Sequence, residues 1–142
     1  MIVPDVNLIL YAYDRTAPAH AVACEWWEKS LSDTQPVGLP WIVVVAFIRL
    51  MTHPTLSENP MTVNPDREAV DAWLERDCVG LLSPGPHTFS LMMDLLRQAG
   101  SGGNLTTDAM IAALAMEHGG TVYTNDRDFD RFPDVIWRNP LV

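Results

Sequence analysis

The sequence predicts a three-layer α/β domain with a mainly parallel central sheet. Short apolar, β-branched runs alternate along the chain with longer segments whose apolar residues recur at spacings of three and four. No internal repeat or low-complexity tract interrupts this alternation. The chain has 142 residues and a hydrophobic content of 48%, which suffices for one compact core. We therefore expect residues 1–142 to form a single domain.

The first predicted strand is the apolar run Ile2–Val3, and a helix over 8–13 follows it. Asp5 stands between the two, and two interpretations of it remain open: a helix N-cap, or a metal ligand at the end of a strand. A second helix follows Pro18 and extends to about Leu31, because its apolar residues form one stripe.

The next predicted strand is Pro36–Leu39, and Pro40 suits the first position of a helix. The run 41–51 is ambiguous. Its β-branched residues favour a strand, whereas its length and leading proline favour a buried helix. Periodicity alone does not separate these alternatives.

The polar, proline-rich segment 53–60 is expected to be a loop. Asn64 is then expected to cap a helix that has Pro65 at its first position. A strand over 79–82 and a helix over 88–98 follow.

Thr106 and Thr107 are expected to cap a helix that ends at Gly119. Asp108 lies in the first turn of this helix, where an acid is favoured by the helix dipole or serves as a metal ligand. A strand over 121–124 follows, and 135–137 is expected to add an edge strand.

The composition limits the available functions. The net charge of −9 argues against simple nucleic-acid binding, but it is compatible with an enzyme that handles phosphates through a bound cation. Cys24 and Cys78 are far apart, so we expect two buried reduced thiols rather than a zinc site or a disulfide framework. No apolar stretch reaches the length of a membrane span and no basic leader is present, so we expect a cytoplasmic protein without membrane association.

Three aspartates stand at predicted strand ends or helix starts, where an open α/β sheet gathers its site: Asp5, Asp108 and Asp126. Carboxylates brought close together repel one another unless one is protonated or a cation lies between them. Mg²⁺ suits such all-oxygen ligands, and Mn²⁺ is an alternative. We predict a divalent metal site that activates a water and stabilises a phosphodiester under attack.

The motifs around these residues resemble those of PIN-domain ribonucleases. Asp5-Val6-Asn7 resembles the opening D-x-N motif, Gly103–Ala109 resembles the third acidic motif, and Thr124–Phe129 resembles the closing T-x-D-x-D-F motif. The order, the spacing and the total length resemble the VapC toxins of toxin–antitoxin pairs, and the similarity covers the whole chain.

This resemblance implies an Mg²⁺-dependent endoribonuclease that a small VapB-type antitoxin inhibits by inserting residues into the active site. It also implies a homodimer. By position, Asp5 and Asp108 would be metal ligands and Asp126 would complete the acidic cluster. Asn7 and Thr124 match polar positions that orient the acids, and Asp128 matches a second acid of the closing motif, which we expect to be structural or peripheral.

One position departs from the family pattern. The family usually has a glutamate in an E-x-x-R motif on the helix after the second strand, and this chain has Ala46-Phe47-Ile48-Arg49 there. The resemblance favours a helix over the ambiguous run 41–51. The missing acid favours one metal ion rather than two, and Asp94 or Asp128 is a candidate to replace it.

An RNA substrate would also need basic groups. Arg127 and Arg131 flank the closing motif, and Arg15 follows the first helix, so these arginines are candidates for phosphate contacts. The alternative is intramolecular pairing with acids that neighbour them in sequence, which are Asp14, Asp128 and Asp130.

Two other functions fit the same residues. A phosphatase or a receiver-like phosphoacceptor also gathers aspartates at a sheet edge, but such sites normally add a lysine. Lys29 is the only lysine, and it lies far from the acids in sequence. A PIN fold that has lost catalysis through Ala46 would instead act as a binding module.

Overall fold

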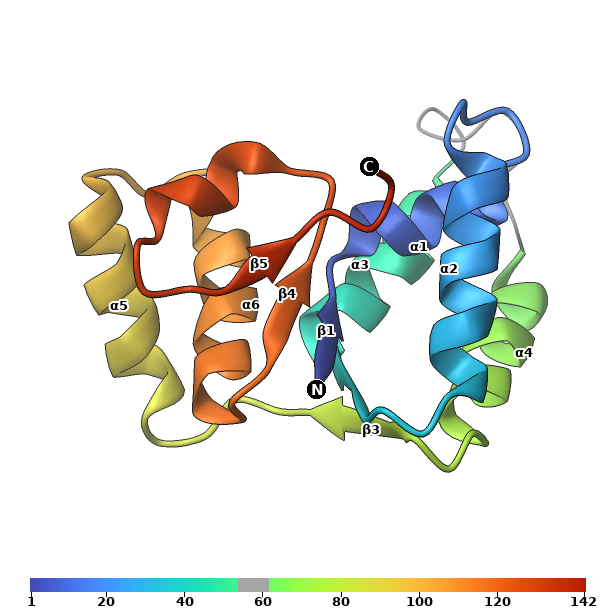
Figure 1. Ribbon diagram of the computed structural model, residues 1–142, viewed down its shortest axis with the longest axis horizontal. Coiled ribbons are helices and arrows are strands. Elements are labelled where there is room, and N and C mark those ends of the chain that lie inside the picture. Colours follow the sequence, from blue (N-terminus) through green and yellow to red (C-terminus); the bar gives the residue numbers. More distant parts are fainter. Residues whose placement is uncertain (54–61) are drawn as a thin grey trace.

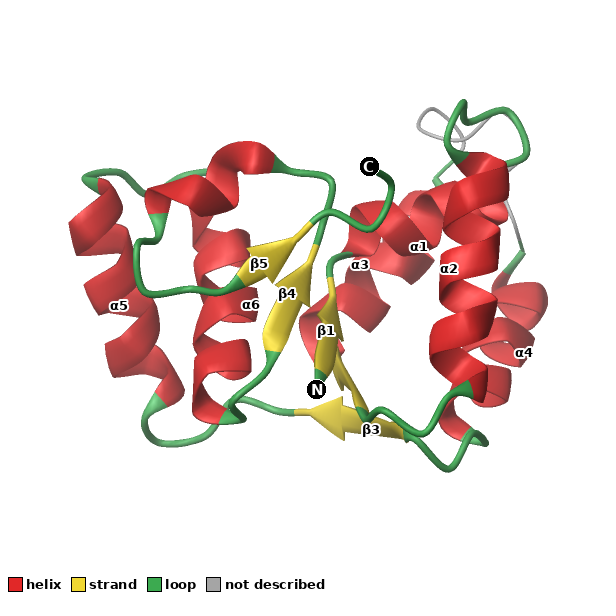
Figure 2. Cartoon of the chain, viewed as in Figure 1, coloured by secondary structure: helices red, strands yellow, loops and turns green. Residues whose placement is uncertain are grey.

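A parallel five-stranded sheet forms the centre of the described structure, in the strand order β3-β2-β1-β4-β5 (Figures 1 and 2). The computed structural model describes residues 1–53 and 62–142. The strands are β1 (Ile2–Pro4), β2 (Val37–Pro40), β3 (Val79–Leu82), β4 (Thr121–Tyr123) and β5 (Trp137–Arg138). The three-layer α/β class and the parallel sheet are therefore confirmed.

Helices cover both faces of this sheet. They are α1 (Val6–Tyr13), α2 (His20–Ser32), α3 (Trp41–Thr52), α4 (Val63–Leu74), α5 (Thr88–Ala99) and α6 (Leu105–Glu117), with a 3-10 turn η1 at Arg127–Arg131. Helices α1 to α4 lie on one side of the strands, and α5 and α6 lie on the other (Figure 1). This division follows from right-handed crossovers, because the chain moves outward from β1 to β3 and then returns across the sheet to β4. None of the described helices is long and apolar enough to cross a membrane.

The core between the sheet and α1 to α4 contains a cluster of aromatic rings. Phe47 and Trp73 are fully buried and their ring centroids are 4.9 Å apart. Tyr13 packs edge-on against both rings, and Trp27 packs edge-on against Trp73. These contacts join all four helices. The run 41–51, which the sequence left open between strand and helix, is a helix whose inner face is buried in this core.

Several predicted boundaries were wrong by a few residues. Helix α4 begins at Val63 with Thr62 as its N-cap, so Asn64 is not the cap and Pro65 lies within the first turn. Proline is tolerated there because first-turn N–H groups have no helical partner. Pro40 is the last residue of β2 and the N-cap of α3, not the first helical residue.

Helix α6 begins at Leu105, before the expected caps Thr106 and Thr107. The N–H of Leu105 donates to the Gly102 carbonyl at 3.2 Å, and Leu105 is buried. A turn at the glycines therefore starts the helix early.

At the C-terminus, β5 is Trp137–Arg138 rather than 135–137. Its register is fixed by pairing with Val122 and Tyr123 of β4. Cys24 and Cys78 are free thiols, as expected, but they are half-buried rather than buried. Most of the loop expected over 53–60 lies outside the described residues.

Candidate active site

The carboxyl ends of β1 and β4 meet at the centre of the sheet. The chain leaves β1 toward β2, whereas β4 pairs with the opposite edge of β1, so the strand order reverses between them. Such a switch point is where open α/β sheets bind ligands. The backbone N–H of Asp5 donates to the Tyr123 carbonyl at 2.9 Å, which joins the two strand ends directly.

Asp5 caps α1 and also contributes to the polar cluster beside it. Its Oδ1 accepts the N–H of Val6 at 2.7 Å, so the N-cap interpretation is confirmed. Its Oδ2 accepts the hydroxyl of Thr124 at 2.7 Å and the amide of Asn7 at 3.2 Å. Asp5 is only 5% exposed, and these three bonds hold its side chain in one place.

Thr124 is the centre of the hydrogen-bond network. While its hydroxyl donates to Asp5, it accepts the Asn7 amide at 3.1 Å and the backbone N–H of Asp126 at 2.9 Å. One donor and two acceptor positions exhaust what a threonine hydroxyl offers. Asn7 also accepts the N–H of Asn125 at 3.2 Å. The positions that we expected to orient the acids thus lie between them.

Three other carboxylates form a compact group at this edge. Asp108, Asp126 and Asp128 each present an oxygen within 4.8 Å of those of the other two. Helix α6 runs antiparallel to β4, which brings the first turn of the helix back to the end of the strand (Figure 1). Asp126 then caps η1 by accepting the N–H of Asp128 at 2.9 Å, so the turn holds both acids together.

The electrostatics of this cluster favour a proton or a cation. Burial, together with the negative charges of Asp5, Asp126 and Asp128, raises the pKa of Asp108 to about 7. Burial also raises the pKa of Asp5, helped by the charge of Asp126, although the bonds from Thr124 and Val6 oppose this shift. Like charges held this close are typical of a site that binds a cation.

Asp128 lies closer to the other acids than the sequence motifs predicted. We expected it to be structural or peripheral, yet its carboxylate lies in the group with Asp108 and Asp126. The D-x-D spacing was the available signal, but it becomes informative only when a 3-10 turn brings both side chains together. Asp94, the other candidate to replace the missing acid, pairs with Arg97 on the exposed surface of α5. Ala46 lies half-buried in α3 and supplies no carboxylate.

The expected phosphate-binding arginines are all exposed. In the described parts of the chain the ion pairs are Arg67–Asp71 and Arg97–Asp94, so the intramolecular pairing considered for Arg15, Arg127 and Arg131 is not found there. Arg131 instead donates from Nη2 to the Ala99 carbonyl at 2.9 Å.

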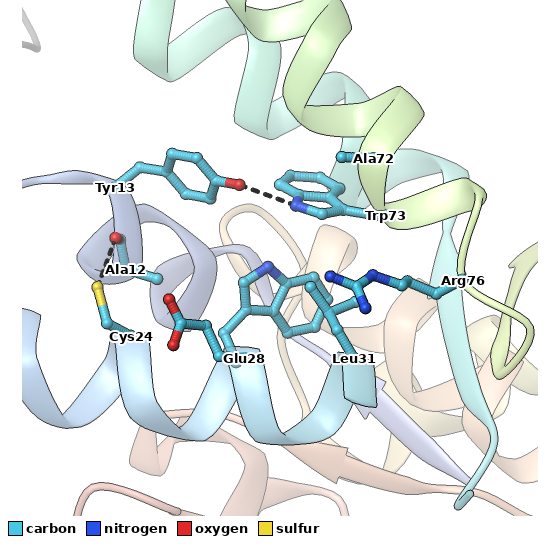
Figure 3. A pocket seen from close by; sticks show the side chains of 9 residues that line it. Ala12, Tyr13, Cys24, Glu28, Leu31, Ala72, Trp73 and Arg76 are labelled. Atoms are coloured by element: carbon cyan, nitrogen blue, oxygen red, sulfur yellow. Dashed lines mark hydrogen bonds between the residues drawn. The ribbon is translucent and has the colours of Figure 1, made fainter. Parts of the chain in front are cut away.

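A separate cavity of about 280 Å³ lies between α1, α2 and α4 and contains none of the four acids. Figure 3 shows its wall, where the indole N–H of Trp73 donates to the Tyr13 hydroxyl at 2.9 Å. The thiol of Cys24 donates to the Ala12 carbonyl at 2.9 Å. The cavity is thus a feature of the helical layer and not of the acidic site.

Comparison with known proteins gives the family. A family model of the PIN domain matches residues 2–135. Ribonuclease VapC33 of Mycobacterium tuberculosis is 33% identical over 141 residues, which cover 99% of each protein. Ribonuclease VapC37 of the same organism is 34% identical over 140 residues, which cover 99% of this chain and 97% of that protein.

Solved structures agree with the fold. The VapBC-1 structure from nontypeable Haemophilus influenzae has a TM-score of 0.70 at 20% identity, with 100% of both chains covered. The sarcin-ricin loop cleaving toxin VapC20 of Mycobacterium tuberculosis has a TM-score of 0.71 at 15% identity, with 96% of this chain and 97% of that chain covered. With a family-model match over most of its length and full-length relatives above 30% identity, the chain belongs to the PIN-domain family.

Proposed function

We propose that this chain is a metal-dependent endoribonuclease and the toxin of a type II toxin–antitoxin pair. The observation that carries the proposal is the group of Asp108, Asp126 and Asp128, each with a carboxylate oxygen within 4.8 Å of the others, near the charge of buried Asp5. Relatives named ribonucleases, 33% and 34% identical over nearly the whole chain, support the reaction class.

The donor set fits a hard divalent cation. Oxygens bound to one Mg²⁺ at about 2.1 Å lie about 3 to 4 Å apart, which is compatible with the spacing of the three carboxylates. All the candidate ligands are oxygens, which suits Mg²⁺, with Mn²⁺ as an alternative. We assign Asp5, Asp108 and Asp126 as the residues that hold the metal. The compact group contains Asp108, Asp126 and Asp128 but not Asp5, so the geometry supports adding Asp128, and Asp5 acts on the group through its charge.

The residues of the chain have separable tasks in this scheme. A bound divalent cation would supply an activated water and stabilise the charge on the phosphodiester. Asp108, with a pKa of about 7, would lose its proton when a cation is held there. Thr124 and Asn7 hold the Asp5 carboxylate in position through their hydrogen bonds, which limits the reorganisation that the site needs.

Basic residues near the acids would position the RNA. Arg127 follows Asp126 directly, is exposed and has no ion-pair partner in the described parts of the chain, so it is the strongest candidate for a phosphate contact. Arg15 and Arg131 are further candidates, although Arg131 already donates to the Ala99 carbonyl.

The partner we propose is a VapB-type antitoxin. Structures of similar fold include VapBC complexes, two of them bound to DNA. We propose that this chain likewise pairs with an antitoxin and forms a homodimer in the cytoplasm. The net charge of −9 would attract a basic partner segment.

An RNA cleavage assay with purified protein tests this function. We expect cleavage with Mg²⁺ or Mn²⁺, none in EDTA, and at least a hundredfold loss in Asp108→Asn. Asp94→Asn is the matched control, because Asp94 lies on the exposed surface of α5 and should leave the rate unchanged. Undiminished cleavage by Asp108→Asn would exclude the assigned site. Addition of the antitoxin encoded beside this chain should abolish the wild-type activity.

Ala46 gives the competing function a direct test. If the missing acid has removed catalysis, the chain would be a binding module that does not bind metal. A Mn²⁺ titration of the wild type and of Ala46→Glu distinguishes the two functions. We expect both proteins to bind Mn²⁺, whereas binding by Ala46→Glu alone would favour the binding module.

A further inference from the structure

A second pocket, of about 260 Å³, lies on the sheet face that α2 covers. Residues of β1, β4, α2 and the C-terminal segment line it. The lining residues that matter here are Ile2, Trp26, Lys29, Asp33, Tyr123 and Pro140.

Two aromatic rings form one wall of this pocket. Trp26 of α2 and Tyr123 of β4 are stacked, with ring centroids 5.8 Å apart and an angle of 25° between the ring planes. Both rings line the pocket and both are only half-buried. A flat aromatic surface that remains accessible is suited to stacking a nucleobase, because every base has a planar π-face.

One cationic side chain lines the pocket, and a second lies on the strand next to Tyr123. Lys29, the only lysine of the chain, lines the pocket one helical turn after Trp26 and is exposed. Arg138 is the register partner of Tyr123 on β5, so its side chain projects from the same face of the sheet. Neither cation has an ion-pair partner in the described parts of the chain.

The one carboxylate that lines this pocket is engaged locally. Asp33 Oδ1 accepts the backbone N–H of Thr34 at 2.7 Å. With 18 acidic and 9 basic residues in the chain, two unpaired cations next to an aromatic pair are a marked local departure from the overall charge. Aromatic rings can stack against the base of a nucleotide, and cations can bind its phosphate.

The backbone of Tyr123 connects this pocket to the acidic site. The carbonyl of Tyr123 accepts the N–H of Asp5, and the next residue is Thr124. On the other side, Asn139 donates its amide to Asn125 at 2.8 Å, and Asn125 in turn donates its N–H to Asn7. Tyr123 of the pocket wall is therefore bonded directly to Asp5, and Asn139, the residue before Pro140, is linked to Asn7 through Asn125.

We propose that this pocket binds a nucleobase of the RNA substrate. The base stacks against Trp26 and Tyr123, and Lys29 and Arg138 bind the adjoining phosphates. The proposal rests on the ribonuclease function and adds a subsite that selects where the RNA is cut. Because stacking is tolerant of sequence, base preference would come from the polar rim of the pocket.

Binding of a short fluorescently labelled single-stranded RNA, measured in EDTA to prevent cleavage, tests the pocket separately from catalysis. We expect Trp26→Ala to weaken binding roughly tenfold or more, and Trp26→Phe to restore most of it. Lys29→Gln, at an exposed position that leaves the fold intact, should weaken binding and reduce its salt dependence by about one counterion. Trp41→Ala and Arg67→Gln are matched controls at exposed positions on α3 and α4, and neither should change the affinity.

The single lysine provides an independent readout. An amine-acylating reagent can modify only Lys29 and the N-terminal amine, so RNA should protect Lys29 in the wild type and not in Trp26→Ala. With Mg²⁺, the same variants should raise KM while kcat changes less than about twofold.

Unchanged RNA affinity in both Trp26→Ala and Lys29→Gln would overturn the subsite. So would loss of antitoxin binding with RNA binding intact, because the pocket would then belong to the protein partner. A wild type that binds RNA through this pocket but never cleaves it would contradict the proposed ribonuclease and leave the subsite standing.

Discussion

The hydroxyl of Thr124 donates to Asp5 Oδ2 at 2.7 Å, across a separation of 119 residues in the sequence. This bond joins the end of β4 to the end of β1, and both groups are buried. The same contact thus helps to hold β1 and β4 together and to orient the carboxylate of Asp5. Loss of this bond should affect both stability and activity.

Replacing Thr124 with valine should show this coupling. The substitution preserves the shape of the side chain but removes the Thr124 hydroxyl as a partner of the buried Asp5 carboxylate and of the half-buried Asn7 amide. We expect the free energy of unfolding in urea to fall by about 1 to 3 kcal/mol. Thr106→Val, at an exposed position in α6, is the control and should change it by less than about 0.5 kcal/mol. Equal stabilities of the two variants would contradict this role of Thr124.

The stability of the cation-free protein should decrease as the pH rises. Asp108 has a pKa of about 7 in the folded protein, against an ordinary value of 3.8. Between these values the folded protein keeps a proton that the unfolded chain has released, so stability falls as the pH rises through this interval and levels off above about 7. Urea unfolding in EDTA at several pH values measures the slope, which should be smaller in Asp108→Asn. A slope of the opposite sign in the wild type, or one unaffected by the substitution, would contradict it.

The same proton should make metal binding dependent on pH. Because a cation must displace the proton from Asp108, Mn²⁺ affinity should increase as the pH rises toward and past about 7. Calorimetry in buffers with different ionisation enthalpies measures the proton release. Mn²⁺ binding that is independent of pH between 6 and 8 would mean that Asp108 is not a ligand.

Asp108→Asn should stabilise the protein when no cation is present. The substitution removes one of four neighbouring negative charges and retains the shape of the side chain. We expect the free energy of unfolding at pH 8 in EDTA to rise by about 0.5 to 2 kcal/mol, as is common when an active-site residue is replaced. Asp94→Asn should not share this gain, since Asp94 pairs with Arg97 in solvent. A loss of stability in Asp108→Asn would show that the carboxylate is not repelled.

The hydroxyl of Tyr13 should contribute to packing in the helical layer. It accepts the indole N–H of buried Trp73, so Tyr13→Phe leaves a donor unpaired (Figure 3). We expect a loss of about 1 to 2 kcal/mol in unfolding free energy, with RNA cleavage retained. Tyr11→Phe, in the same helix, makes the same chemical change without breaking this bond and should be nearly neutral.

Much of the fold followed from the sequence because the patterns were local. Alternating apolar runs and amphipathic segments predicted the strands and helices, and the motifs identified the family. The run 41–51 was different, because its helical state depends on burial of Phe47 against Trp73, which lies on another helix. The early start of α6 depends likewise on the turn at Gly102, with Asn104 rather than a threonine at the N-cap position.

The sequence predicted where the candidate site lies, but not every residue that belongs to it. Asp5 and Asp126 were predicted to follow strands and Asp108 to lie in the first turn of a helix. The structure brings these strand ends and this helix start to one edge of the sheet. The inclusion of Asp128 depends on a 3-10 turn that has no periodic signature. The contact between Trp26 and Tyr123 joins two distant segments, so only the folded chain reveals it.

Cation-dependent cleavage of RNA by the wild type and by Asp126→Asn tests the central claim most directly. The wild type should cut the RNA when Mg²⁺ or Mn²⁺ is present, stop in EDTA and resume when the cation is restored. Asp126→Asn should lose activity under every condition, because it removes a carboxylate shared by the acidic group and the cap of η1. Cleavage that persists in EDTA, or that is unchanged in Asp126→Asn, would contradict a metal-dependent nuclease site at the ends of β1 and β4.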